Sequence, residues 1–372
     1  MRSIVSFTAA AAVAAPALAQ TPTFNDVVYA NVLRDDGASM PVRLDVYWTS
    51  NIAPTSPAPC VVWIHGGGWV GGTHDNVPQM VRTLLTNGFV VASVEYRLSG
   101  EAIFPAQIHD VKGAIRHLKR NAATYRIDPA RIGTWGTSAG GHLSALMLTS
   151  NNVFEAEGNV GGVGPRATIR AAVDFFGPTD ILNMNLDVTT PPGSNIDHDA
   201  PTSPESQLIG FDAPGQGIGV LRANQNNPAA PFPEKMRLVN LANPITHVDP
   251  RDLRIFIAHG TADTSVPIKQ SQRLFDAMNA VNTSAQYTPV TGAGHGALGA
   301  AVEAAARQFL IDELTRCLPD LNRDGLVDDA DFVRFAFSYN TLFDIRADFN
   351  GDGLCDDSDF VIFAAAYESL GC

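Results

Sequence analysis

Four separated segments of the sequence carry residue types that can perform nucleophilic acyl transfer if the fold brings them together. They are His65-Gly66-Gly67-Gly68, Gly136-Thr137-Ser138-Ala139-Gly140, Asp263 and His295, in that order. A serine hydroxyl becomes an effective nucleophile when an adjacent base takes its proton and a carboxylate orients that base. We therefore expect Ser138 to be the nucleophile, His295 the general base and Asp263 the orienting acid. Asp249 and Asp252, upstream of the same predicted strand, are the alternatives for the acid.

The glycines in these segments suit the donors that acyl transfer requires at the developing oxyanion. We predict that the backbone N–H groups of Gly67, Gly68 and Ala139 serve this purpose, because glycine lets the backbone approach a ligand closely. Ser138 has a glycine two residues away on each side. This pattern is typical of a sharp turn from a strand into a helix, which exposes the serine Oγ. His65 is expected to shape the glycine loop by hydrogen bonding.

Short runs of β-branched and aromatic residues alternate with helical stretches through most of the chain. The predicted strands are residues 42–49, 61–65, 89–94, 132–135, 169–176 and 253–259, and the predicted helices include 106–123 and 141–149. This alternation predicts an α/β fold whose mostly parallel sheet is covered by helices on both faces. Binding sites of such sheets form at the carboxyl ends of the strands. The glycine segment, Ser138 and Asp263 each follow a predicted strand, so we expect them at one edge of the sheet.

Residues 181–247 interrupt the alternation and are rich in Pro, Asn, Asp and Gly. A segment of this length inside a compact domain is usually functional or mobile. We interpret it as an insertion over the site that contributes to substrate choice. The alternative is a surface loop without such a role.

The first nineteen residues have the features of a secretory signal peptide. Arg2 precedes an apolar stretch over residues 4–15, and Ala17-Leu18-Ala19 forms a small-residue cleavage site. No later stretch is apolar over the roughly 20 residues that a membrane span needs. We expect a secreted protein, which is extracellular, periplasmic or held at the cell surface. The net charge of −13 with only 25 Lys and Arg argues against nucleic acid as a partner.

A step in composition predicts a second, small domain at the carboxyl end. Residues 317–372 carry a net charge of −9 out of −13 for the chain. We therefore expect one large domain over residues 20–316 and an acidic one over 317–372. Cys317 and Cys372 bracket the acidic segment, and a disulfide between them, permitted in an exported protein, would join its two ends. Whether they pair is left open, and Cys60 is expected to be a buried free thiol.

The acidic segment contains two copies of a calcium-loop pattern, 28 residues apart. Such a loop supplies oxygen ligands from positions 1, 3, 5, 7, 9 and 12, with a glycine at position 6. The expected ligands are Asp320, Asn322, Asp324, Leu326 (by its carbonyl), Asp328 and Asp331, then Asp348, Asn350, Asp352, Leu354 (by its carbonyl), Asp356 and Asp359. We expect two structural Ca²⁺ ions in an all-α domain, and no cofactor for catalysis.

An apolar stripe follows each loop and predicts two helices that pack together. The stripes are Phe332, Phe335, Ala336 and Tyr339, then Phe360, Phe363, Ala364 and Tyr367.

Residues from about 41 to 315 resemble the bacterial feruloyl and acetylxylan esterases (BD-FAE), within the hormone-sensitive-lipase-like hydrolases. The resemblance rests on VWIHGGGWVGG, VEYRLSGEAIFPAQIHDVKGAIRHLKRNA, YRIDPARIGTWGTSAGGHLSAL, HGTADTSVPIKQSQRLFDAM and GAGHG. It implies an α/β-hydrolase fold, Ser138, Asp263 and His295 as the triad, and hydrolysis of acyl esters, often on plant-wall polysaccharide. Some relatives act instead on short alkyl esters, as lipase-like enzymes, or on formamides, as arylformamidases. A non-catalytic surface scaffold is the hypothesis from a different class.

The acidic segment resembles a dockerin domain, because its loops carry Asp in place of the usual Glu at position 12. Its closing Gly371-Cys372 is similar to tails of secreted planctomycete proteins. The resemblance implies a cohesin-like or cell-surface partner. A calcium-stabilised cap or sorting tag without a cohesin is the open alternative.

Overall fold

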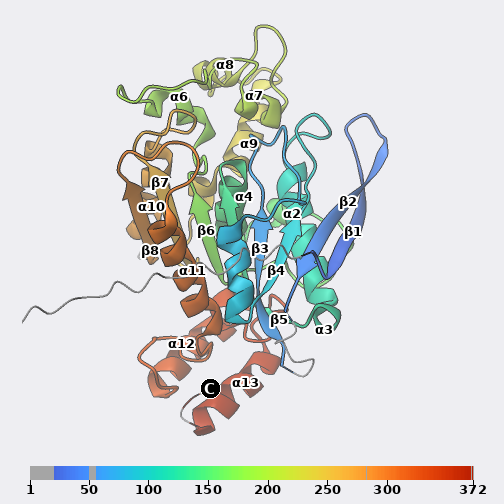
Figure 1. Cartoon of the computed structure of the whole chain (residues 1–372), viewed down its shortest axis with the longest axis vertical. Helices are drawn as coiled ribbons and strands as arrows, with labels where there is room; N and C mark the ends of the chain where they lie inside the picture. Colours follow the sequence, from blue (N-terminus) through green and yellow to red (C-terminus); the bar gives the residue numbers. More distant parts are fainter. Residues whose placement is uncertain (1–20, 50–55, 282, 370, 372) are drawn as a thin grey trace, which may run out of the picture.

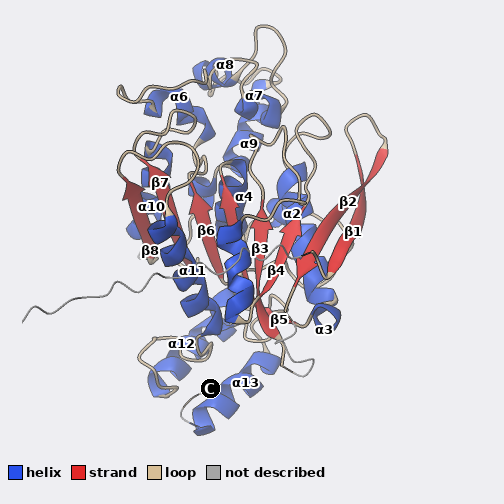
Figure 2. Ribbon diagram, in the orientation of Figure 1, coloured by secondary structure: helices blue, strands red, loops and turns tan. Residues whose placement is uncertain are grey.

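A single eight-stranded sheet forms the centre of the molecule (Figures 1 and 2). A computed structural model describes residues 21–49, 56–281, 283–369 and 371, so the predicted signal peptide and Cys372 lie outside it. The strands are β1 (Phe24–Leu33), β2 (Ser39–Tyr47), β3 (Ala58–Ile64), β4 (Val90–Val94), β5 (Ile127–Thr137), β6 (Ala171–Phe175), β7 (Arg254–Gly260) and β8 (Ala285–Val290). Their order in the sheet is β1-β2-β4-β3-β5-β6-β7-β8.

The sheet is mostly parallel, as the sequence predicted, and it is antiparallel at one edge. β1 pairs antiparallel with β2, and β2 pairs antiparallel with β4, whereas β3 to β8 pair in parallel with their neighbours. All six predicted strands exist with shifted ends. The two strands that the sequence analysis did not predict, β1 and β8, are the edge strands, and each is partly exposed along its length.

Helices cover both faces of the sheet (Figure 2). The α-helices are α1 (Gln79–Arg82), α2 (Ala106–Arg120), α3 (Ala122–Tyr125), α4 (Ala139–Thr149), α5 (Phe154–Glu157), α6 (Met184–Asp187), α7 (Pro204–Ile209), α8 (Ile218–Ala223), α9 (Phe232–Ala242), α10 (Lys269–Ala280), α11 (Ala300–Thr315), α12 (Asp329–Tyr339) and α13 (Asp357–Ser369). Short 3₁₀ helices span Thr83–Asn87, Ile181–Asn183, Pro244–His247 and Ile345–Ala347.

The alternation of side chains along β3 explains the two apolar layers. Cys60, Val62 and Ile64 are buried with residues of α2, α4 and α10 on one face. Val61 and Trp63 are buried with residues of α1 and α11 on the other face. Successive side chains of a strand point to opposite faces, so a continuous apolar run indicates a strand that is covered on both sides. Cys60 is free and buried, as predicted.

Residues 181–247 and the acidic segment lie at opposite ends of the molecule (Figure 1). The first segment folds into the short helices α6 to α9 beyond the carboxyl ends of the parallel strands. The acidic segment, with α12 and α13, lies below the other ends of the strands. Residues 181–247 can therefore contact a site at the carboxyl ends of the strands, and the acidic segment covers the opposite end of the sheet (Figure 1).

The two predicted apolar stripes of the acidic segment pack against each other. The rings of Phe335 and Phe363 stack with centroids 5.1 Å apart, and both side chains are buried. Phe332 contacts Phe363, and Phe360 contacts Phe335, at centroid distances of 6.0 Å. Cys317 brackets this unit, but its predicted partner Cys372 lies outside the described residues, so the pairing stays a prediction.

The acidic segment also makes close contacts with the large domain. The buried Lys119 ammonium donates to the Gly351 carbonyl at 2.8 Å, and Arg170 donates to the Ile345 carbonyl at 2.6 Å. A Cβ at Gly351 would lie 2.5 Å from backbone atoms of Pro129 and Ala130. The second loop is therefore built into the contact between the two parts of the chain.

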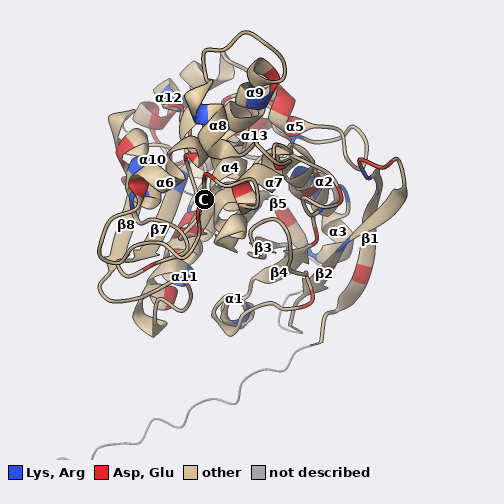
Figure 3. Cartoon of the chain, turned by 90° about the horizontal axis from the view of Figure 1, so that it is seen from above, with Lys and Arg blue, Asp and Glu red and all other residues tan. Residues whose placement is uncertain are grey.

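Charged residues of both signs are spread around the molecule in the view from above (Figure 3). Among the described residues, no helix is long and apolar enough to span a membrane.

Candidate active site

Ser138 lies at a strained turn between β5 and α4. Its φ of 54° falls in the left-handed region that side chains rarely adopt. A Cβ at Gly136 would lie 2.0 Å from the Gly140 carbonyl oxygen, and one at Gly140 would lie 2.1 Å from the Ile64 carbonyl oxygen. Only glycine fits at either position, which explains the spacing seen in the sequence. The turn holds the serine at the carboxyl end of β5.

The structure brings Ser138, His295 and Asp263 into one hydrogen-bonded series. His295 Nε2 lies 3.0 Å from Ser138 Oγ, and its Nδ1 lies 2.7 Å from Asp263 Oδ2. The other oxygen of Asp263 accepts the backbone N–H groups of Ser265 and Val266 at 2.8 and 2.9 Å. The carboxylate is thus fixed on both sides, and the imidazole can hold its proton on Nδ1 and accept another at Nε2.

Asp263 remains ionised because hydrogen bonds outweigh its burial. Burial raises the pKa of this carboxyl, but donation from His259 and His295 holds the pKa well below its usual range. His259 is fully buried at the end of β7, and its Nε2 lies 3.2 Å from Asp263 Oδ2. The predicted alternatives do not contact His295: Asp249 pairs with Arg251, and Asp252 accepts the Asp249 backbone N–H.

The glycine loop after β3 lies against the serine turn. A Cβ at Gly66 would lie 2.8 Å from the Thr137 carbonyl oxygen and 3.3 Å from Ser138 Cβ. Gly67 and Gly68 have φ values of 118° and 60°. Within the described ranges, no acceptor pairs with the backbone N–H groups of Gly67, Gly68 or Ala139. Three donors without protein partners therefore border Ser138, as an oxyanion site requires.

His65 shapes the glycine loop, as the sequence suggested. Its Nδ1 lies 2.8 Å from the Gly66 carbonyl oxygen, and its ring stacks on Tyr96 at 4.4 Å. Burial lowers the pKa of His65. Burial thus favours the neutral form of the ring, which packs against Tyr96 within the loop.

Ser138 and His295 line a cavity of about 760 Å³. Its walls include the aromatic residues Trp63, Trp69, Phe175 and Phe176. Residues 181–247 also contribute to the lining, through Ile196, His198, Pro204 and Glu205. The volume suits a small organic ligand. The interpretation that this segment lies over the site agrees with these lining residues.

Sequence reasoning missed two supports of the site. The Phe176 ring lies 4.7 Å from the His295 ring, and Phe176 has a φ of 48°. His142, buried in the first turn of α4, accepts the Trp69 indole N–H at 3.2 Å. The position of His142 four residues after Ser138, on the helix that follows the nucleophile, was a signal that could have indicated this role.

The two acidic loops share one hydrogen-bond pattern. Asp320 and Asp348, at position 1, accept backbone N–H groups of their own loops, including those of Gly325 and Gly353 at 3.0 and 2.9 Å. Both glycines have positive φ, 94° and 91°, as the sharp turn at position 6 requires.

The last carboxylate of each loop is also suited to a cation. Asp331 and Asp359, at position 12, are fully buried and accept backbone N–H groups. Burial, with Asp348 nearby, raises the pKa of Asp359 to about 6. A buried carboxylate among other acidic groups fits a bound cation, and the oxygen donor set suits Ca²⁺.

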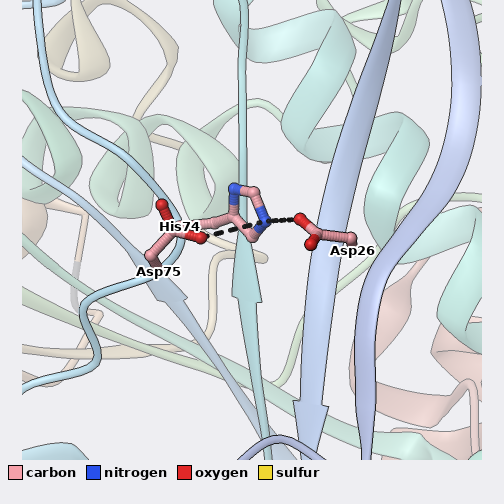
Figure 4. A group of neighbouring side chains, drawn as sticks. All are labelled: Asp26, His74 and Asp75. Carbon is pink, nitrogen blue, oxygen red and sulfur yellow. Dashed lines mark hydrogen bonds and ion pairs between the residues drawn. The ribbon is translucent and has the colours of Figure 1, made fainter.

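A different group of side chains lies on the antiparallel side of the sheet (Figure 4). Ligand atoms of Asp26, His74 and Asp75 lie within 4.8 Å of one another and could hold a metal ion. His74 Nε2 is 3.2 Å from Asp26 Oδ1, and the His74 carbonyl accepts the Ser93 hydroxyl at 2.6 Å. These contacts tie the segment after the glycine loop to β1 and β4.

The parallel sheet, the strained serine turn and the Ser–His–Asp series together define an α/β-hydrolase. Residues 44–278 match the BD-FAE family, and the chain belongs to this family. Esterase LipC of Mycobacterium tuberculosis is 29% identical over 266 residues, which cover 70% of this chain and 58% of LipC. The chain thus spans little more than half the length of this relative.

Two solved structures are similar to this chain, at sequence identities close to that of LipC. A truncated form of a carbohydrate esterase from gut microbiota has a TM-score of 0.64 at 29% identity, covering 81% of this chain and 99% of that one. A bifunctional GH43-CE protein of Bacteroides eggerthii has a TM-score of 0.62 at 33% identity, covering 77% of this chain and 37% of that one.

Proposed function

We propose that the protein is a secreted serine carboxylic-ester hydrolase that removes acetyl or hydroxycinnamoyl groups from polysaccharide or related small esters. The observation that carries this proposal is the series Ser138 Oγ, His295 Nε2, His295 Nδ1 and Asp263 Oδ2, with distances of 3.0 and 2.7 Å. It opens on a cavity that is bordered by unpaired backbone donors. The names of the relatives, an esterase and a carbohydrate esterase, support the same reaction class.

The reaction has two stages with balanced proton transfers. Ser138 Oγ attacks the ester carbonyl carbon while its proton passes to His295 Nε2, and the N–H groups of Gly67, Gly68 and Ala139 stabilise the oxyanion. His295 then protonates the departing alkoxide, the C–O bond breaks, and the acyl group remains on Ser138. Water gives its proton to His295 and attacks the acyl-enzyme, which releases the acid and restores the Ser138 hydroxyl.

Asp263 supports both stages without changing its protonation state. Its ionised carboxylate stabilises the imidazolium that forms in each stage and keeps the ring in the required tautomer. Export through the N-terminal segment is part of the proposal, and N-terminal sequencing of the exported protein should find Gln20 as the first residue.

The acidic segment is proposed to hold two Ca²⁺ ions through the ligand set of its two loops. These residues would supply carboxylate, amide and backbone carbonyl oxygens, and the ions would stabilise the loops without a part in ester cleavage. The segment is proposed to attach the enzyme to a cohesin-like or cell-surface partner. Its position at the end of the sheet opposite the cavity leaves the cavity accessible in such a complex (Figure 1).

A panel of substrates tests the proposed specificity. Wild-type protein and Ser138→Ala are assayed on acetylated xylan, methyl ferulate, short p-nitrophenyl esters and the aryl formamide N-formylaniline. We expect acetate or ferulate release by the wild type and none by Ser138→Ala. Turnover of p-nitrophenyl esters or formamides alone would favour the short-chain esterase or arylformamidase alternative, and no turnover of any substrate would favour the scaffold.

A further inference from the structure

Residues 181–247 place a histidine–glutamate pair in the wall of the cavity. His198 and Glu205 both line it, and their side chains are only 1% and 3% exposed. His198 Nδ1 lies 3.0 Å from Glu205 Oε1. The His198 backbone N–H donates to Asn185 at 2.9 Å, and Glu205 belongs to the first turn of α7. The backbone therefore fixes both residues before any ligand arrives.

Each member of the pair leaves one polar atom without a partner. Among the described residues, His198 Nε2 and Glu205 Oε2 are buried and form no hydrogen bond. Buried polar atoms are nearly always paired in native proteins, and leaving one unpaired is unfavourable. Two unpaired atoms on neighbouring side chains of one cavity indicate a ligand that supplies their missing partners.

The pair is close to the reaction chemistry through the residue that precedes Glu205. A Cβ at Gly68 would lie 3.2 Å from Pro204 Cβ, so the start of α7 rests on the proposed oxyanion loop. A group bound by His198 and Glu205 therefore belongs to the same substrate whose carbonyl reaches Ser138.

The position of the proton on His198 determines which substrate group the pair can bind. With its proton on Nδ1, His198 donates to Glu205 Oε1, and the two remaining atoms, His198 Nε2 and Glu205 Oε2, are both acceptors. Each of these two acceptors can take one hydroxyl donor of a ligand. The aromatic walls, which include Trp63 and Trp69, suit the apolar face of a sugar ring.

We propose that His198 and Glu205 form a hydroxyl-binding subsite that recognises free hydroxyls on the alcohol part of the ester, as on a partly acylated sugar ring. This inference rests on the proposed ester hydrolysis at Ser138 and assigns its substrate class. It gives residues 181–247 a defined part in substrate choice. The pair acts as a specificity determinant and takes no part in bond cleavage.

The test compares two substrates that differ in their hydroxyl groups. Methyl 2-O-acetyl-xylopyranoside carries free hydroxyls beside the ester, and cyclohexyl acetate has a similar ring without them. The main variant is the double replacement His198→Phe with Glu205→Met, which removes both polar groups and leaves no unpaired partner, so that folding is preserved. Glu205→Gln is the conservative variant, and Gln207→Ala is the control, because Gln207 lies on α7 outside the cavity lining.

The expected result is a selective loss. The double variant should lower kcat/KM for the xyloside by about tenfold or more, as expected when hydrogen bonds to a charged group are lost. Its kcat/KM for cyclohexyl acetate should stay within about twofold of the wild type. Glu205→Gln should lose less than the double variant, and Gln207→Ala should match the wild type on both substrates.

Other outcomes would overturn the inference in distinguishable ways. Equal losses on both substrates, or no loss on either, would show that the pair has a structural role only. A wild type that cleaves cyclohexyl acetate and leaves the xyloside intact would keep the esterase and remove the subsite. A wild type inactive on every ester would remove the proposed function together with the subsite.

Discussion

At the scale of single residues, Asp263 makes more contacts than orientation of His295 alone would need. Besides His295, it accepts two backbone N–H groups and lies against His259. Hydrogen bonds from both histidines, acting against burial, keep the pKa of Asp263 low. The carboxylate therefore stays charged in the folded protein, and protonation of Asp263 should not limit activity as the pH falls.

The first prediction follows from that fixed charge. Asp263→Asn should lower kcat on p-nitrophenyl acetate by on the order of 10⁴-fold. The replacement removes the charge that stabilises the imidazolium, and it no longer holds the neutral ring in the required tautomer. Circular dichroism should show an unchanged fold. Asp252→Asn is the matched control, since Asp252 makes no contact with His295, and it should retain activity. A loss of similar size in both variants would contradict the assignment of the acid.

A second prediction concerns Asp174, a fully buried residue of β6 beside the site. Burial raises the pKa of its carboxyl to about 7. The folded state therefore keeps a proton between about pH 4 and 7 that the unfolded chain releases, and stability must fall as the pH rises through this window. Asp174→Asn removes this dependence.

The measurement for Asp174 is the free energy of unfolding of both proteins at several pH values. Between pH 5 and pH 8, the free energy of unfolding of Asp174→Asn should rise by about 2 to 3 kcal/mol relative to that of the wild type. Comparing the two curves cancels the contribution of every other titrating group. If the free energies of unfolding of the two proteins vary with pH in parallel, the pKa of Asp174 in the folded protein is close to its pKa in the unfolded chain.

At the scale of elements, the serine turn depends on close approach of three backbone segments. Gly140 lies where β3, β5 and α4 meet. A Cβ added at Gly140 would lie only 2.1 Å from the Ile64 carbonyl oxygen. We predict that Gly140→Ala lowers the free energy of unfolding by about 3 kcal/mol or more, because the backbone must shift. Gly100→Ala, at a position with nothing within 4 Å, is the control and should be nearly neutral. Equal stability of the two variants in urea unfolding would contradict this packing.

The elements that the sequence predicted are those with strong local signals. Continuous apolar runs identified β3 and β4, which are buried on both faces. β1 and β8 were missed because an edge strand is half exposed, and Pro289 within β8 further weakens its pattern. Because the glycine segment, Ser138 and Asp263 each follow a predicted strand, the sequence was enough to predict that they lie at one edge of the sheet.

The part of the site that could not be predicted comes from residues 181–247. Its helices α6 to α8 have at most six residues each, too short to give a helical period in the sequence. His198 and Glu205 are seven residues apart and meet only because the chain turns into α7 between them. Such a pair has no signature in sequence spacing. The fold of the segment, set by tertiary contacts, decides which of its residues reach the cavity.

At the scale of the whole molecule, the acidic segment is tied to the large domain. Lys119 and Arg170 donate to carbonyls of the segment, and Ala130 shares an apolar cluster with Phe335 and Phe363. Asp348, the first proposed ligand of the second loop, is buried beside this contact, 3.5 Å from the Thr168 hydroxyl. Calcium in that loop would therefore stabilise the contact between the two parts as well as the segment itself.

The fourth prediction is a calcium-dependent shift of the main thermal transition. Ca²⁺ at about 100 times its dissociation constant adds roughly 2.7 kcal/mol for each of the two loops, which together raise Tm by about 7 °C relative to EGTA. The variant with Asp320→Asn and Asp348→Asn should lose this response while keeping esterase activity. Identical melting curves of the wild type in Ca²⁺ and in EGTA would contradict the proposed calcium binding. They would not bear on the proposed ester hydrolysis.

The most direct test of the central claim is the reaction of the protein with a fluorophosphonate, followed by peptide mapping and ester turnover in parallel. A single adduct on Ser138 should appear as activity is lost. Folded Ser138→Ala should take no label, and its kcat should be lower by on the order of 10⁶-fold. A folded Ser138→Ala that hydrolyses esters at the wild-type rate, or an adduct on another residue that accompanies the loss, would contradict the account.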